Sequence, residues 1–178
     1  MQARILTIIL LTIVVVGGYL MVAHADEPKE PVWGNSTNGI AIAVNCTKPQ
    51  YVLGKEAEFI VAIKNVSNTA MNVIRSNPYA QYRMALFDQD GQPVAKSKIV
   101  IEEENRLPSQ TGREGSRNIL DIVAPGRYLN EMFNLLDWFN IDKAGRYQLV
   151  VMRQVDSSWD KGFAISNLAQ VEITKPNE

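Results

Sequence analysis

The sequence predicts an all-β fold, an antiparallel β-sandwich of about eight to ten strands that follows an N-terminal signal segment. Three observations support this prediction. Short apolar or alternating runs recur roughly every 8–12 residues and are separated by turns rich in Gly, Pro, Asn and Asp. No long segment combines a helical period with capping residues. In segment 146–155, Tyr147, Leu149 and Val151 share one face and further apolar residues lie on the other, which is typical of a central strand with a buried inner face.

The first 25 residues have the composition of a secretory signal peptide. Arg4 supplies a positive charge, residues 5–22 are apolar, and Ala23-His24-Ala25 places small residues at the two positions that signal peptidase reads. We therefore expect an exported protein that is periplasmic, extracellular or associated with the envelope. The alternative is an uncleaved membrane anchor, because the apolar run approaches the length that spans a bilayer.

Three regions follow from this interpretation: a signal peptide over 1–25, a polar linker or flexible lead-in over 26–38, and the sandwich domain over 39–178. Pro28, Pro31 and Gly34 disfavour regular structure in the lead-in.

Nine segments have the pattern of strands, and 57–65 shows it most clearly. Phe59, Val61 and Ile63 alternate with more polar residues, so one face of this strand is expected to be buried. The predicted strands are 39–45, 57–65, 70–76, 81–88, 94–103, 119–123, 128–135, 146–155 and 163–174.

Three connections have recognisable turn chemistry. Asp90-Gly91 suits a hairpin turn that needs a positive φ, and it predicts that 94–103 returns as a strand. The sequence Ala-Pro-Gly-Arg at 124–127 predicts a second turn, and 135–140 could form one short helical turn.

The stretch 136–153 combines carboxylates and aromatic residues in a way that could indicate catalysis. A structural interpretation explains it better: Gly145 permits a tight turn, and Tyr147 can bury its ring and return its hydroxyl to the backbone as a tyrosine corner. Trp138 and Phe139 would close the end of the core. No pairing of a base with a nucleophile is evident here.

The order of these segments resembles that of bacterial Ig-like sandwich domains. The matching landmarks are FIVAIKNVSNTAMNV, YRMALFDQDGQPV and APGRYLNEMFNLLDWFNIDKAGRYQLVVM, and together they extend over about 39–174. The bacterial intracellular proteinase inhibitor family has a similar order, as do accessory sandwich domains of some secreted metalloendopeptidases. The resemblance implies an Ig-like fold and a binding or inhibitory role. The chain departs from the inhibitor family in having an export signal, and no inhibitory contact residue can be matched.

Composition excludes several classes of function. The formal net charge is −1, and no cluster of Lys and Arg indicates a nucleic-acid partner. His24 is the single histidine and would be removed with the signal peptide, so Ser–His and Cys–His catalysis and His-ligated metals are excluded from the mature chain. We expect no metal and no cofactor. Cys46 is the single cysteine, is expected to be a small buried hydrophobe, and cannot form an intramolecular disulfide.

The best candidate for a recognition surface is the polar segment 104–118 together with the turn 156–162. Long polar connections often carry function, and Arg and Trp are enriched at binding hot spots. The candidate contact residues are Arg106, Arg113, Arg117 and Trp159. The competing interpretation is that these segments only connect strands and bind no partner.

We therefore expect a non-enzymatic binding domain whose partner is a protein in the cell envelope or outside the cell. A membrane would be a partner if the N-terminal segment were retained. One alternative is a proteinase inhibitor that presents loops to an enzyme cleft. A second is a hydrolase that uses carboxylates alone, for example Glu102 or Asp137.

Overall fold

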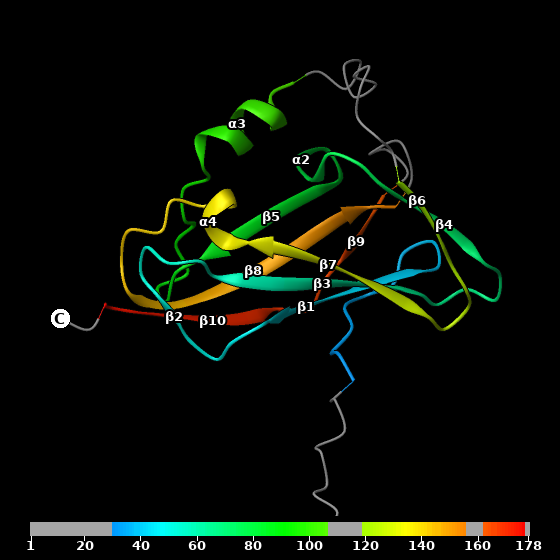
Figure 1. Cartoon of the computed structure of the whole chain (residues 1–178), viewed down its shortest axis with the longest axis horizontal. Helices are drawn as coiled ribbons and strands as arrows, with labels where there is room; N and C mark the ends of the chain where they lie inside the picture. Colours follow the sequence, from blue (N-terminus) through cyan, green and yellow to red (C-terminus); the bar gives the residue numbers. More distant parts are fainter. Residues whose placement is uncertain (1–29, 107–118, 156–161, 177–178) are drawn as a thin grey trace, which may run out of the picture. The chain divides into compact units, whose positions relative to one another are not determined.

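A computed structural model describes residues 30–106, 119–155 and 162–176 (Figure 1). The chain divides into two compact units, 1–30 and 31–178, and the elements below all belong to the second. The strands are β1 Ile40–Cys46, β2 Tyr51–Val52, β3 Glu58–Asn65, β4 Met71–Arg75, β5 Tyr82–Phe87, β6 Ile119–Val123, β7 Tyr128–Asn134, β8 Gly145–Gln154, β9 Phe163–Ile165 and β10 Ala169–Thr174. The helices are α2 Pro78–Gln81, α3 Lys98–Glu104 and α4 Leu135–Trp138. The predicted signal peptide lies outside the described residues.

The described strands form an Ig-like β-sandwich, as the sequence predicted. One sheet has the order β1-β3-β7 and is antiparallel throughout. The other has the order β2-β10-β8-β5, with β9 also paired to β8; it is antiparallel except for the parallel pair β2–β10. A separate two-stranded ribbon is formed by β4 and β6.

The core lies between the inner faces of the two sheets, and it contains both sets of residues that alternation predicted. Phe59, Val61 and Ile63 are buried in β3, while Leu149 and Val151 are buried in β8. Strand β8 has neighbours on both sides, which confirms its central position. The other fully buried side chains with the largest volumes are Tyr82, Phe139, Ile42, Met84, Leu86, Leu135, Val44 and Val100.

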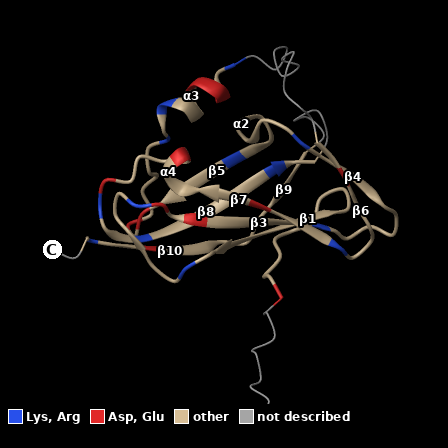
Figure 2. Ribbon diagram, viewed as in Figure 1, with Lys and Arg blue, Asp and Glu red and all other residues tan. Residues whose placement is uncertain are grey.

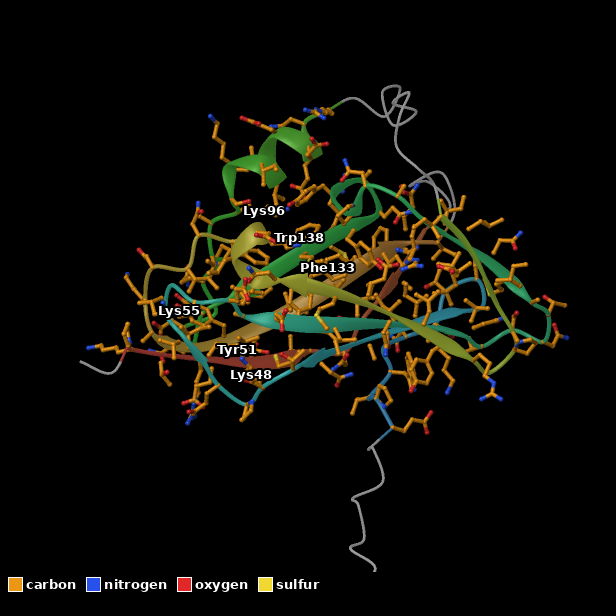
Figure 3. The ribbon with its side chains drawn as sticks, in the orientation of Figure 1. Lys48, Tyr51, Lys55, Lys96, Phe133 and Trp138 are labelled. Carbon is orange, nitrogen blue, oxygen red and sulfur yellow. The ribbon has the colours of Figure 1, made fainter. Side chains whose placement is uncertain are left out.

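Tyr147 forms the predicted tyrosine corner. Its ring is buried and its hydroxyl donates a hydrogen bond of 2.6 Å to the carbonyl of Lys143. Trp138 and Phe139 are also buried, and the indole of Trp138 contacts the ring of Phe133 at 6.2 Å between centroids (Figure 3). Helix α4 is the expected helical turn, and the Asn134 side chain accepts a hydrogen bond from Leu136 N at its start.

The prediction that 94–103 returns as a strand is wrong. Gly91 has the expected positive φ of 75°, but the hairpin continues only to the Phe87–Pro93 bridge. Hydrogen bonds from Asp88 N to Gln92 O and from Val94 N to Leu86 O flank this bridge, and the chain leaves β5 after Val94. It then pairs with the residue that follows α4 through the Lys96–Phe139 bridge and forms α3, whose single buried residue is Val100. Tertiary packing therefore overrides the alternating pattern.

Two further details differ from the sequence-based interpretation. The final segment 163–174 is two strands, β9 and β10; between them the Ser166 hydroxyl accepts from Val151 N, and the Asn167 side chain bonds the main chain of Val44. Cys46 is only half-buried; its thiol donates to the carbonyl of Gln170, and burial raises its pKa.

Candidate binding surface

The sequence-predicted contact residues are only partly within the described structure. Arg106 follows α3, is exposed, and forms an ion pair with Glu103 in which Nη1 and Oε1 are 2.6 Å apart. Arg113, Arg117 and Trp159 lie outside the described residues.

The residues that flank the two undescribed internal segments gather around segment 75–82. Ile119, which follows the first segment, pairs with Arg75. Glu103, the ion-pair partner of Arg106, accepts a hydrogen bond from Asn77. On the other flank, Arg153 of β8 pairs with Tyr82. The described residues that flank 107–118 and 156–161 therefore lie at the same end of the sandwich.

The ribbon β4–β6 is at this end, and its outward side is apolar. Asn72 pairs with Ile122, and Ile74 pairs with Leu120. Because directly paired residues share a face, all four side chains lie on the outward side of the ribbon. We call these four residues the ribbon face. The side chains of Ile74, Leu120 and Ile122 are 44%, 56% and 73% exposed. In Figure 2 most of β4 and β6 has the colour of uncharged residues.

The inward side of the ribbon attaches it to the domain. Val73 and Val123 are 4% and 5% exposed, which orients the ribbon with the other face outward. Next to them, Arg75 Nε lies 2.5 Å from Asp121 Oδ2 in an ion pair between the strands. The main chain is held as well, because Ile74 O accepts hydrogen bonds from Gln81 and Arg153.

Asn65, at the end of β3, fixes the turn between β6 and β7. The side chain is 2% exposed and its Nδ2 donates to Val123 O at 2.8 Å and to Thr69 O at 2.7 Å. Its Oδ1 accepts from the amide and hydroxyl of Ser67. The backbone of Asn65 bonds Gly126 N and Arg127 O, so one residue connects both arms of the turn.

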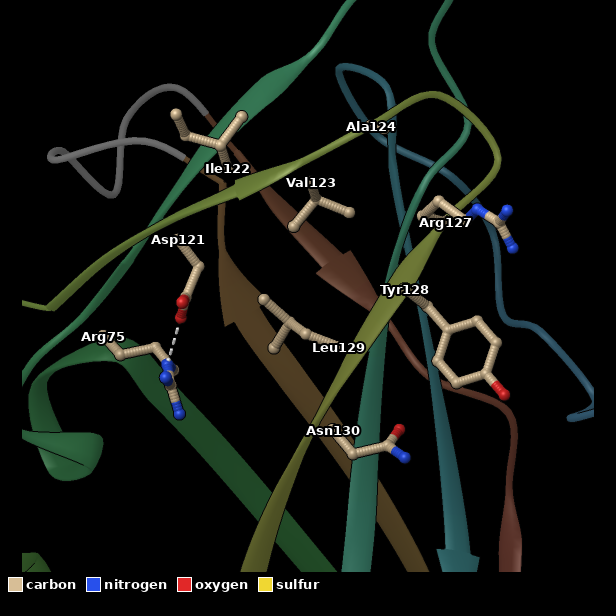
Figure 4. A pocket seen from close by; sticks show the side chains of 9 residues that line it. All are labelled: Arg75, Asp121, Ile122, Val123, Ala124, Arg127, Tyr128, Leu129 and Asn130. Atoms are coloured by element: carbon tan, nitrogen blue, oxygen red, sulfur yellow. Dashed lines mark hydrogen bonds and ion pairs between the residues drawn. The ribbon is translucent and has the colours of Figure 1, made fainter.

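A cavity of about 350 Å³ opens between the diverging strands β6 and β7 (Figure 4). After the 124–127 turn, β6 pairs with β4 while β7 pairs with β3, so the two strands separate. We call this cavity the fork. It is lined by Arg75, Asp121, Ile122, Val123, Ala124, Arg127, Tyr128, Leu129 and Asn130.

A buried polar cluster lies on the inner side of β5, β7 and β8. The guanidinium of Arg153 lies 4.8 Å from the centre of the Tyr82 ring, and its Nη1 lies 3.8 Å from Glu131 Oε1. Arg153 Nη2 donates to Ile74 O at 2.8 Å. Burial raises the pKa of Tyr82 well above its usual range, with Glu131 adding to the rise and Arg153 opposing it. This cluster connects the core to the base of the ribbon.

The carboxylates considered for catalysis do not line the fork. Glu102 is exposed on α3 and lies 3.7 Å from Lys98, and Asp137 is exposed on α4. Glu103 and Glu104, which follow Glu102 in α3, are only partly exposed, and Glu104 Oε1 lies 2.7 Å from Lys96 Nζ.

Within 30–106, 119–155 and 162–176, no group of three His, Cys, Asp or Glu side chains is placed to share a metal ion. No helix of these same residues is long and apolar enough to cross a membrane.

Sequence reasoning missed the ribbon face and Arg153. The signal for the ribbon was present in the sequence. Residues 119–123 are apolar on both faces of the predicted strand, although this strand lies between a long polar segment and a Pro-Gly turn. Such a strand is either buried on both faces or exposes apolar side chains. Arg153 continues the inward phase of Leu149 and Val151, and the chain offers no other sign that an arginine is buried there.

No protein-family model and no curated protein matches the sequence. Among solved structures, the chain is similar to the CARDB domain of a Pyrococcus furiosus protein in complex with di-metal ions, with 12% identity over 79% of this chain and 93% of that chain and a TM-score of 0.36. It is also similar to the β-glucosidase from Listeria innocua in complex with glucose, with 14% identity, 88% of this chain covered and a TM-score of 0.37. The chain spans 19% of that enzyme. Similarities of this size carry no argument about function.

Proposed function

We propose that this protein is an exported, non-catalytic Ig-like domain that recognises another protein of the cell envelope or the extracellular space. The observation that carries the proposal is the ribbon face, where Ile74, Leu120 and Ile122 are exposed side by side on one side of a two-stranded ribbon. Export rests on the composition of residues 1–25.

The ribbon face is a poor arrangement for a surface that contacts only water. Single exposed aliphatic side chains are ordinary, but adjacent ones on the same face indicate an interaction surface. Burying one such side chain contributes about 1.5–3 kcal/mol. Two-stranded ribbons are weak structures by themselves, and this one is attached through Val73 and Val123 rather than through the apolar face. The ribbon face is therefore available to a partner.

The sequence-based candidates extend this surface. Arg106 is exposed, and the described flanks of 107–118 and 156–161 lie around 75–82, next to the ribbon. We therefore include Arg113, Arg117 and Trp159 in the proposed contact surface, since Arg and Trp are enriched in binding hot spots.

The test is capture from an envelope extract with the mature chain, comparing variants of equal stability. The variants Leu120→Ser and Ile122→Ser should weaken capture of the protein that the wild type retains, as should Arg113→Ala and Trp159→Ala. The matched control is Ile101→Ser, because Ile101 is 48% exposed but lies on α3. Each of these variants should unfold within about 0.5 kcal/mol of the wild type, as is usual for surface positions. If the ribbon variants capture as well as Ile101→Ser, the surface lies elsewhere.

The same variants separate the two other functions that the sequence left open. For a proteinase inhibitor, the captured partner would be a proteinase, and the wild type would lower its activity. A carboxylate hydrolase would lose activity on Glu102→Gln or Asp137→Asn and would be indifferent to Leu120→Ser. Neither carboxylate lines the fork, which favours binding over hydrolysis.

A further inference from the structure

The fork offers unpaired strand edges to a ligand. Strand β6 has one hydrogen-bonded neighbour among the described strands, β4, and strand β7 has one, β3. A strand with one neighbour exposes backbone N–H and C=O groups along its other edge. In Figure 4 the strands diverge from the 124–127 turn with the cavity between them. An extended chain laid along one of these edges would complete its ladder.

The lining of the fork also has a charge preference. It contains two guanidinium groups, from Arg75 and Arg127, and one carboxylate, from Asp121. Arg75 already uses its Nε to pair with Asp121. Arg127 is exposed, and its side chain has no ion-pair partner within the described residues. The fork therefore has an uncompensated positive charge beside apolar walls from Val123 and Leu129.

We propose that the fork binds an extended peptide segment of the partner protein, and that this segment carries an acidic side chain. This inference rests on the proposed function. The peptide backbone pairs with a free edge of β6 or β7, its apolar side chains contact Val123 and Leu129, and its carboxylate accepts hydrogen bonds from Arg127. An arginine presents several N–H donors in one plane, which matches the two oxygens of a carboxylate.

The shape of the site favours an internal peptide segment over a small anion. A free anion would use Arg127 alone and leave the strand edges and apolar walls without a role. The continuity of the site with the ribbon face supports the same conclusion, because Ile122 belongs to both. A partner that covers the ribbon face can therefore continue into the fork as an added strand.

The experiment titrates the isotope-labelled domain, residues 26–178, with short peptides and records backbone amide shifts by NMR. The probe is an N-acetylated, C-amidated peptide of alternating valine and glutamate; the comparison peptides replace glutamate with glutamine or lysine. A further probe of valine and glutamine has a free C-terminal carboxylate. We expect saturable shifts at 119–123 and 127–131 with the glutamate peptide, and weaker binding of the other three.

Arg127→Glu should lower the affinity for the glutamate peptide by about tenfold or more, which corresponds to the loss of a charge-assisted hydrogen bond. Arg127→Lys should retain part of the affinity. The control is Arg146→Glu, an exposed arginine of β8 that does not line the fork. The inference is overturned if the glutamate peptide causes no shifts at millimolar concentration. It is also overturned if the lysine peptide or the free-carboxylate peptide binds as tightly as the glutamate peptide, or if Arg127→Glu and Arg146→Glu bind the glutamate peptide with equal affinity.

These outcomes can be separated from those of the proposed function. If Leu120→Ser loses partner capture while the peptides fail to bind, the ribbon face is the interaction surface and the inference about the fork is wrong. If the glutamate peptide binds through Arg127 while Leu120→Ser captures normally, the fork is a peptide site and the role of the ribbon face is wrong.

Discussion

At the scale of single residues, alternation along a strand predicted burial well. Phe59, Val61 and Ile63 were assigned to one inner face and Tyr147, Leu149 and Val151 to another, and all six are buried. The side-chain period of a strand makes such assignments reliable once the strand is known. Arg153 could not be assigned in this way, because its burial depends on Glu131, Tyr82 and Ile74 O, which come from three other strands.

Leu149→Ala should lower the free energy of unfolding by about 2–5 kcal/mol, from lost transfer energy and the cavity that remains. Leu149 has no exposed surface and lies in the central strand β8. Urea denaturation measures the loss, and Gln148→Ala, on the exposed side of the same strand, is the control. A loss below about 1 kcal/mol would mean that the strand is peripheral.

Tyr82 should make the fold sensitive to alkali. Burial raises its pKa above the usual value, so the folded state keeps the phenolic proton at a pH where the unfolded chain loses it. Its contribution is therefore fully present below about pH 10 and is lost as the pH rises towards the folded pKa. Tyr79 and Tyr147, whose pKa values burial also raises, act in the same direction.

Tyr82→Phe should reduce the loss of stability between about pH 8 and pH 11, measured by urea denaturation at each pH. At neutral pH the same variant should change stability by less than about 1 kcal/mol, because the hydroxyl has no hydrogen-bond partner within the described residues. An alkaline slope equal to that of the wild type would show that Tyr82 is not responsible.

At the scale of elements, most strands were predictable and the exceptions have physical causes. Segment 94–103 alternates like a strand, but its pairing with β5 ends at Val94, and a helix forms at 98–104 with Val100 as its buried residue. The separation of β4 and β6 from the sheets was also not predictable. It depends on Asn65, which holds the turn at 124–127 through contacts distant in sequence.

Asn65→Ala should destabilise the domain by about 1–3 kcal/mol, because it leaves buried partners without hydrogen bonds. It should also increase amide exchange at 119–130 more than in the β8–β10 pair. Asn72→Ala, on the exposed side of the ribbon, is the control. Equal effects of the two substitutions would contradict a special role for Asn65.

At the scale of the whole molecule, the sequence predicted the class of fold and a candidate surface at 104–118 and 156–162, but neither the ribbon face nor the fork. An Ig-like sandwich can present loops at either end or a strand edge, and composition does not choose among them. We propose that the surface lies at the end where the ribbon face, the fork and the described flanks of 107–118 and 156–161 come together. Arg106 is exposed, and its role as a contact residue stays a prediction; the aliphatic residues nearby were overlooked because they were expected to be buried.

Export is tested by the intact mass of the protein recovered from the envelope or the medium. We expect a chain that begins at Asp26, because small residues occupy both positions before the predicted cleavage site. A mass that still includes residues 1–25 would establish the membrane anchor instead.

We propose that a protein partner binds at the ribbon face and the fork. Hydrogen–deuterium exchange of the mature chain, with and without the partner purified by capture, tests it most directly. Binding should slow exchange at 71–75 and 119–130 and leave α3 and the β8–β10 pair unchanged. Slower exchange confined to α3 or to the β8–β10 pair, with 71–75 and 119–130 unaffected, would contradict it.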